Sequence, residues 1–223
     1  MIEYKPIRKE CGEIPRLGRE ILEGYSKHES AKVLDSMESH GLMYSSIKPV
    51  VRGSKLCGQA ITVRGADARA IARAADNIQR GDILVISSCG IHDIAVGCAW
   101  LYSYLEKKQA GGCIVDGAVC DADAIHAGRL PVFARAVCAR RYFPENEGEV
   151  NITISCGGML VAPGDILLGD DDGVVTVPAF DALRTLRLSD EHLALELAKV
   201  KRNENGEKLY ETSGCIPRAD AWK

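Results

Sequence analysis

Two apolar runs separated by a helical segment constrain the fold of this chain more than any other feature. Asp82–Ser87 and Cys113–Gly117 each have the pattern of a short buried strand, and Ile94–Lys108 between them predicts a helix. A strand, a helix and a second strand form a right-handed crossover, which places both strand ends and the helix start on one side of the sheet. The sequence therefore predicts an α/β fold with a parallel core.

The predicted strand ends bring several functional candidates together. Gly97 lies near the start of the helix, and the turn after the second strand carries Cys120, Asp121 and Asp123. Ligands of open α/β sheets bind outside the carboxyl ends of the strands, and free amides at a helix start attract anions. One hypothesis is a ligand carboxylate opposite Asp121. The alternative is that Asp121 and Asp123 merely cap the following helix.

The composition is that of an ordinary globular protein and excludes several functions. The formal net charge is −3, with Lys and Arg interspersed among Asp and Glu, so nothing favours nucleic-acid binding. No run approaches the length of about 18 apolar residues that a membrane span needs, and the N-terminus lacks the apolar core of a signal peptide. We expect a cytoplasmic protein with no nucleic-acid or membrane partner.

Nine cysteines are spread along the chain. None has C-x-x-C spacing, and no close pair accompanies a His-x-x-x-His pattern, which argues against a zinc site or a redox dithiol. In a reducing compartment most of these thiols are expected to be small buried hydrophobic residues. Three lie in the two loops of the predicted strand-helix-strand unit, namely Cys89, Cys98 and Cys120.

The remaining segments predict further elements around this unit. Helices are expected at Leu17–His40, with a break near Gly24, and at Ala66–Ile78, Ala122–Ala127 and Phe180–Arg202; strands are expected at Gly58–Val63, Pro131–Arg135, Asn151–Ser155 and Gly173–Val177.

The acidic run Asp170–Asp172 invites comparison with a calcium-binding loop. Alignment of its first and last residues with the third and fifth loop positions leaves Leu168 at the first position and Ala179 at the twelfth. Neither residue offers a side-chain oxygen, so a tight hairpin turn is the better interpretation.

Four sequence blocks resemble, in order and spacing, the RraA-like family. They are Gly81–Val85, Gly112–Asp123, Pro131–Arg135 and Val161–Pro178. That family contains the class II 4-hydroxy-4-methyl-2-oxoglutarate aldolases, which also decarboxylate oxaloacetate, and the regulator of ribonuclease E activity. The resemblance runs from about Ala31 to Gly206. It implies a single swivelling β/β/α domain at residues 18–206, with flanking N- and C-terminal helices, an arm at 1–17 and a tail at 207–223.

The resemblance also implies a metal-dependent site at the predicted strand ends. Asp121 matches the metal ligand, which would hold Mg²⁺ or Mn²⁺, and the helix-start amides of Gly97, Cys98, Ala99 and Trp100 match the seat of the substrate carboxylate. Asp123 would lie behind the metal ligand. Glu196, on the last predicted helix, would reach the site of a neighbouring subunit.

Two positions depart from the aldolase pattern. Cys120 stands where the aldolases have the arginine that binds the substrate, and Cys98 or Ala99 stands where they have an acidic residue. A thiol provides neither the fixed charge nor the bidentate geometry of a guanidinium. Restoring arginine at position 120 should therefore raise activity, unless Arg140 or Arg141 already supplies the positive charge.

Three functions are compatible with these residues. The preferred one is a metal-dependent lyase acting on a small 2-oxo acid, in which Asp121 and Cys120 lie at the reacting centre with Asp123 and Glu196 in support. The alternative is a non-catalytic ring that binds a protein partner, as in the ribonuclease regulator. A third hypothesis, Cys120 as a nucleophile, needs a base, for which His92 is the candidate.

The chain also has more apolar surface-forming segments than one core requires. The leucine-rich face of Phe180–Arg202 and the aromatic residues Tyr210 and Trp222 predict a homotrimer or a homohexamer.

Overall fold

The computed structural model describes residue 7 and residues 9–141 and 148–213. Its main sheet has the strand order β1-β8-β3-β4-β6-β7-β2. The bounds are Lys9–Glu10 (β1), Glu149–Val150 (β8), Leu56–Arg64 (β3), Ile83–Ser87 (β4), Gly112–Val119 (β6), Val132–Val137 (β7) and Lys48–Pro49 (β2). Short strand β5 (Ala95–Gly97) pairs with β6, and hairpin β11–β12 (Ile166–Asp170, Gly173–Val177) joins the sheet through β3. Strands β9 (Ile154–Cys156) and β10 (Met159–Val161) form a separate ladder.

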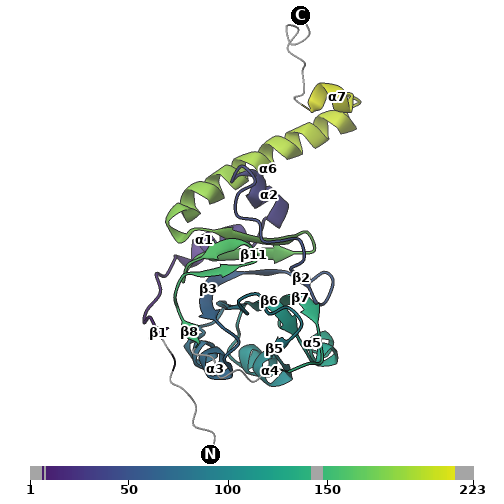
Figure 1. The fold of residues 1–223 in the computed structure, drawn as a ribbon. Coiled ribbons are helices and arrows are strands. Elements are labelled where there is room, and N and C mark those ends of the chain that lie inside the picture. The colour runs from purple at the N-terminus through teal and green to yellow at the C-terminus, as the bar shows by residue number, and fades with distance from the viewer. Residues whose placement is uncertain (1–6, 8, 142–147, 214–223) are drawn as a thin grey trace, which may run out of the picture.

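Helices cover the sheet on two sides. On one side lie α3 (Ala68–Asn77), α4 (Ala99–Lys107) and α5 (Ala122–Ala127). On the other, the hairpin β11–β12 packs against α1 (Arg19–Tyr25), α2 (Ser30–Asp35) and α6 (Ala182–Glu204), which follows a 3-10 turn at Ala179–Asp181 (Figure 1). The last helix is α7 (Leu209–Thr212). In the described part of the chain, no helix is both long and apolar enough to span a membrane.

Continuous apolar strands form the centre of the sheet. Strands β3, β4, β6 and β7 are mutually parallel, and every residue of β4 is buried. Such runs suit strands that are covered on both faces. Leu84 and Ile86 pack toward the layer of α3 and α4, whereas Ile83 and Val85 join the opposite cluster.

The predicted strand-helix-strand unit is confirmed as β4–α4–β6, with one correction. The helix begins at Ala99 and not at Ile94, because Ala95–Gly97 extends as β5 beside β6. The Ala95 amide donates to the carbonyl oxygen of Arg140 over 2.8 Å, so this segment is paired on both sides.

Three other predicted elements need correction. The Leu17–His40 segment forms two short helices, and α2 ends at Asp35. The predicted Asn151–Ser155 strand is interrupted because Asn151 has a positive φ of 51°, so β9 starts only at Ile154. The hairpin turn at Asp171 and Asp172 is confirmed by the pairing of Asp170 with Gly173. Trp222 lies outside the described residues.

Candidate active site

The ends of three parallel strands form the candidate site. Gly97 of β5 pairs with Val119 of β6, and Val119 pairs with Val137 of β7. The Cys120 amide donates to the Gly97 carbonyl oxygen over 3.0 Å. Helix α4 starts directly after β5, and α5 starts directly after β6. The fold therefore brings the start of α4 and the Cys120–Asp121 turn together, as the crossover predicts.

Asp121 connects the two helix starts. Its backbone lies in the left-handed region (φ 60°, ψ 48°), and its carbonyl oxygen accepts from the Ala124 amide over 2.9 Å. Its side chain does not cap α5. Instead, Oδ2 accepts a hydrogen bond from the Ala99 amide at the start of α4, over 2.8 Å. Capping of the following helix thus does not account for this exposed carboxylate.

The start of α4 offers further hydrogen-bond donors. Cys98 is the N-cap residue, with extended backbone and no capping bond from its side chain. The first amides of a helix have no intrahelical partner. Asp121 satisfies the amide of Ala99, which leaves those of Trp100 and Leu101 as donors for an anion.

Tyr102 explains why Gly97 has no side chain. A Cβ atom at Gly97 would lie 2.6 Å from the Tyr102 hydroxyl oxygen, well inside van der Waals contact. Tyr102 is only 4% exposed, and its hydroxyl has no hydrogen-bond partner among the described residues. Burial raises the pKa of this hydroxyl far above its ordinary value.

Cys120 is a poor candidate for a nucleophile in this environment. It is 6% exposed, and its thiol donates to the Gly97 carbonyl oxygen over 3.3 Å. Burial, together with the nearby charge of Asp121, raises its pKa to about 11, so the thiol is neutral near pH 7. His92 is exposed, and among the described residues it makes no hydrogen bond to Cys120. This environment argues against Cys120 as the nucleophile that attacks a substrate.

Arg141 approaches the site from the segment that follows β7. Ala95 forms a parallel bridge with Arg141, next to the Ala95–Arg140 hydrogen bond. The positive charge of Arg141 acts on the Cys120 thiol and opposes the rise of its pKa. The fold therefore brings the charge of Arg141 within electrostatic range of the Cys120 thiol.

Two predicted site residues lie elsewhere. Asp123 is exposed in the first turn of α5. Glu196 lies on α6, across the sheet from α4 and α5 (Figure 1), and its Oε1 accepts from Lys32 Nζ over 2.6 Å. In its own chain Glu196 is therefore remote from Asp121, and its role toward a neighbouring subunit stays a prediction.

The segments that form this site lie within a region that matches a known protein family. The model of the RraA-like family, described as Aldolase/RraA, matches residues 30–176. The chain belongs to this family. A protein of Halalkalibacterium halodurans, provisionally named a 4-hydroxy-4-methyl-2-oxoglutarate aldolase, is 31% identical over 148 residues, which cover 66% of this chain and 70% of the relative.

Solved structures share the RraA-like fold. The Streptomyces coelicolor protein RraAS2, an unusual member of the RNase ES inhibitor RraA family, is 24% identical with a TM-score of 0.73, covering 82% of this chain and 96% of that one. An uncharacterised protein from Pseudomonas syringae is 21% identical with a TM-score of 0.79, covering 89% of this chain and 99% of that one. At these identities the similarity shows the fold alone.

Asp121 is a candidate ligand for a hard cation at the strand ends. The described residues contain no group of three His, Cys, Asp or Glu side chains arranged to enclose a metal ion. Mg²⁺, however, is commonly held by one or two carboxylates together with substrate and water. In this RraA-like chain Asp121 provides one exposed carboxylate, oriented by the Ala99 amide, and this donor set fits Mg²⁺ or Mn²⁺.

An ion pair that the sequence patterns did not reveal connects β6 and β7. Asp116 and Arg135 are in contact, and Asp116 Oδ2 also accepts from the Gly157 amide over 2.6 Å. Arg135 lies over the ring of Tyr44, 5.2 Å from its centroid. Asp116 and Arg135 both lie in the sequence blocks that resemble the family. Their contact follows only from the strand pairing, in which the preceding residues Val115 and Ala134 are partners.

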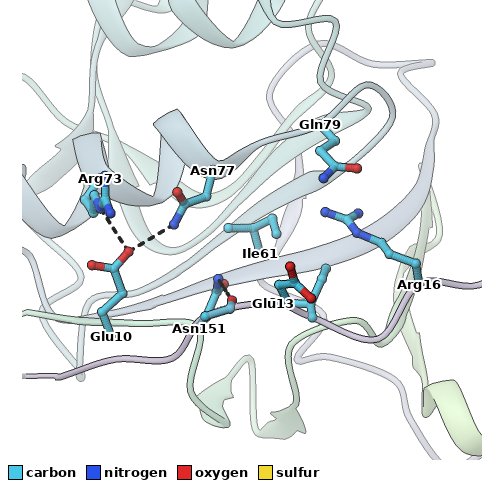
Figure 2. A pocket seen from close by; sticks show the side chains of 10 residues that line it. Glu10, Glu13, Arg16, Ile61, Arg73, Asn77, Gln79 and Asn151 are labelled. Carbon is cyan, nitrogen blue, oxygen red and sulfur yellow. Dashed lines mark hydrogen bonds and ion pairs between the residues drawn. The ribbon is translucent and has the colours of Figure 1, made fainter.

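Away from the strand ends, a cavity of about 510 Å³ lies between the N-terminal arm and α3 (Figure 2). At one end, Glu10 accepts from Arg73 over 2.9 Å and from Asn77 over 3.3 Å. Arg16, at the other end, binds the buried carboxylate of Asp82. These contacts attach the arm to the domain, so the strand ends remain the better candidate for function.

Proposed function

We propose that this protein is a metal-dependent lyase that acts on a small 2-oxo acid, through aldol cleavage that releases pyruvate, decarboxylation of oxaloacetate, or both. The observation that carries the proposal is the contact between the exposed Asp121 carboxylate and the first amide of α4. It combines a ligand for a cation with donors for an anion at one edge of the sheet.

The chain's own residues would divide the work as follows. Asp121 would hold Mg²⁺ or Mn²⁺, and the Ala99 amide fixes the orientation of its carboxylate. When bound, the ion supplies a Lewis acid for the 2-oxo group of the substrate. The amides of Trp100 and Leu101, at the positive end of the helix dipole, bind the substrate carboxylate. Arg141 adds positive charge beside Cys120.

Decarboxylation of oxaloacetate tests this assignment directly. We expect turnover with Mg²⁺ or Mn²⁺ above the rate of the metal alone, and its loss when EDTA is added. Asp121→Asn keeps the size and the backbone preference of the residue and should abolish turnover. Asp123→Asn is the matched control and should retain it. Equal activity in the two variants would contradict the proposal.

The neutral thiol of Cys120 favours a second candidate, a non-catalytic ring that binds a protein partner. The aldolase pattern has arginine at this position, and a buried protonated thiol cannot replace its charge. RraAS2 is described as belonging to an RNase ES inhibitor family. A folded protein that binds Mn²⁺ but does not decarboxylate oxaloacetate would favour this candidate over the lyase.

Either function would use an assembly, and we propose a homotrimer or a homohexamer. The far half of α6 exposes Leu195 and Leu197, each about 60% exposed, and Val200 at 48%. Light scattering should show a trimer or a hexamer at micromolar concentration. Replacement of Leu195 and Leu197 by Glu should weaken the assembly, whereas a monomeric parent chain would contradict it.

A further inference from the structure

Three cysteines stand in a row at the ends of adjacent parallel strands. Because Gly97 pairs with Val119 and Val119 pairs with Val137, the next residue of each strand, Cys98, Cys120 and Cys138, lies beside its neighbour. The Cys120 amide bonds to the Gly97 carbonyl over 3.0 Å, and the Cys138 amide bonds to the Val119 carbonyl over 2.8 Å. The sequence argues against a redox dithiol because C-x-x-C is absent, but the strand register creates neighbouring thiols without that spacing.

The register suits a disulfide. Neighbouring strands lie about 4.7–4.9 Å apart, inside the range of about 4.4–6.8 Å between Cα atoms that disulfides require. Residues opposite one another in a parallel ladder project to the same face. Cys98 is partly exposed and Cys120 is buried, so a small oxidant reaches Cys98 first.

The central thiol has two neighbours, and the structure distinguishes them. The Cys138 thiol donates to the Asp93 carbonyl over 3.1 Å and accepts from the Arg140 amide over 3.4 Å, so two bonds hold it in another loop. Cys98 makes no capping bond, and the Cys120 thiol already points to the carbonyl oxygen of Gly97, the residue directly before Cys98. Cys98 is therefore the partner of Cys120.

We propose that Cys98 and Cys120 form a reversible disulfide when the protein meets a peroxide, and that this bond closes the candidate site. Hydrogen peroxide converts the Cys98 thiol to a sulfenic acid and releases one water. The Cys120 sulfur then attacks the sulfenic sulfur, the S–O bond breaks, and the hydroxyl leaves with the Cys120 proton as a second water. Two electrons pass from the thiols to the peroxide, and dithiothreitol reverses the reaction.

The effect on the site follows from its position and rests on the proposed function. The disulfide would join the two residues directly before Ala99 and Asp121, whose hydrogen bond already connects the helix start to the turn. To form the disulfide, the Cys120 thiol must leave the Gly97 carbonyl oxygen, and the turn that carries Asp121 shifts toward the start of α4. The shift narrows the space between Asp121 and the Trp100 and Leu101 amides that would bind the substrate, so oxidation should lower oxaloacetate turnover at least fivefold.

Mass spectrometry after hydrogen peroxide treatment tests the pairing independently of function. We expect a peptide pair linked through Cys98 and Cys120, which disappears with dithiothreitol and is absent in Cys98→Ser and Cys98→Ala. It should persist in Cys138→Ser and in a control that lacks the exposed thiols of Cys11 and Cys89. A link between Cys120 and Cys138, or no link in the folded parent chain, would overturn the inference.

Turnover separates this inference from the proposed function. A Cys98–Cys120 link in a protein that never decarboxylates oxaloacetate would support the cysteine pairing and contradict the proposed lyase function. A parent chain that forms the Cys98–Cys120 link but keeps its oxaloacetate turnover after peroxide treatment would contradict the claim that the disulfide closes the site. Turnover that falls with peroxide and recovers with dithiothreitol, in step with the link, supports both.

Discussion

The Asp121 carboxylate accepts a hydrogen bond from the Ala99 amide at 2.8 Å, across 22 positions of sequence. This contact ties the first turn of α4 to the left-handed residue that starts α5. A negative charge at a helix start typically contributes about 0.3–1 kcal/mol. The Asp121 side chain is also exposed to solvent. Asp121 therefore combines a modest structural role with the capacity to hold a cation.

Metal binding should therefore be visible in thermal stability. A ligand present at about 100 times its Kd stabilises the folded state by about 2.7 kcal/mol. Mg²⁺ or Mn²⁺ should raise the Tm of the parent chain and of Asp123→Asn, measured by calorimetry. The shift should vanish in Asp121→Ala, and an equal shift in that variant would place the metal elsewhere.

Gly97→Ala should destabilise the protein by about 1–3 kcal/mol, because the new Cβ meets the Tyr102 hydroxyl at 2.6 Å. Tyr102→Phe alone should cost little, since the hydroxyl it removes is buried without a partner among the described residues. In the double variant, removal of the hydroxyl should restore part of the loss. Urea unfolding of the four proteins measures the coupling, and additive effects would contradict this packing.

The position of Arg141 decides whether Cys120→Arg raises or lowers activity. Since Cys120 is buried and Arg141 already acts on it, Cys120→Arg should crowd the site and lower oxaloacetate turnover. Arg141→Ala should lower kcat/KM about tenfold or more, because one charge donor is lost. Arg140→Ala is the matched control. A gain of activity in Cys120→Arg would show that the site lacks a positive charge.

Buried thiols should make the folded state less stable at alkaline pH. Burial raises the pKa of Cys120 to about 11 and that of Cys113 to about 12, against about 8.5 in an unfolded chain. Between these values the unfolded state has lost protons that the folded state keeps, so the free energy of unfolding falls as pH rises.

Each thiol lowers the free energy of unfolding by at most about 1.4 kcal/mol per pH unit. Urea unfolding between about pH 8 and pH 10.5 should show the decline. Cys113→Ala should make it shallower, and replacement of the exposed Cys11 should leave it unchanged. Equal slopes in all three proteins would mean that other groups cause it.

Sequence patterns predicted the elements whose signals are local. The apolar run of β4, the helix at Ala122–Ala127 and the turn at Asp171 and Asp172 follow from neighbouring residues, and the structure contains all three. The contact between the start of α4 and the Cys120–Asp121 turn was also predicted, because the crossover rule fixes where strand ends meet.

The features that sequence patterns did not predict depend on pairing between distant segments. Three residues at Ala95–Gly97 have no periodicity, and only β6 makes them a strand. The left-handed backbone of Asn151 breaks a run that otherwise has β-branched residues. The row of Cys98, Cys120 and Cys138 exists only through the register of three strands.

Hydrogen exchange in the projecting end of α6 can report whether the protein assembles. Its buried residues, Ala182, Thr185, Leu186 and Ser189, all lie in the first eight positions of the helix. Beyond them the helix extends away from the sheet (Figure 1), so its amide protons in an isolated chain exchange with solvent through local fraying. Slow hydrogen exchange over residues 192–204 would therefore measure directly how tightly a neighbouring molecule covers this helix.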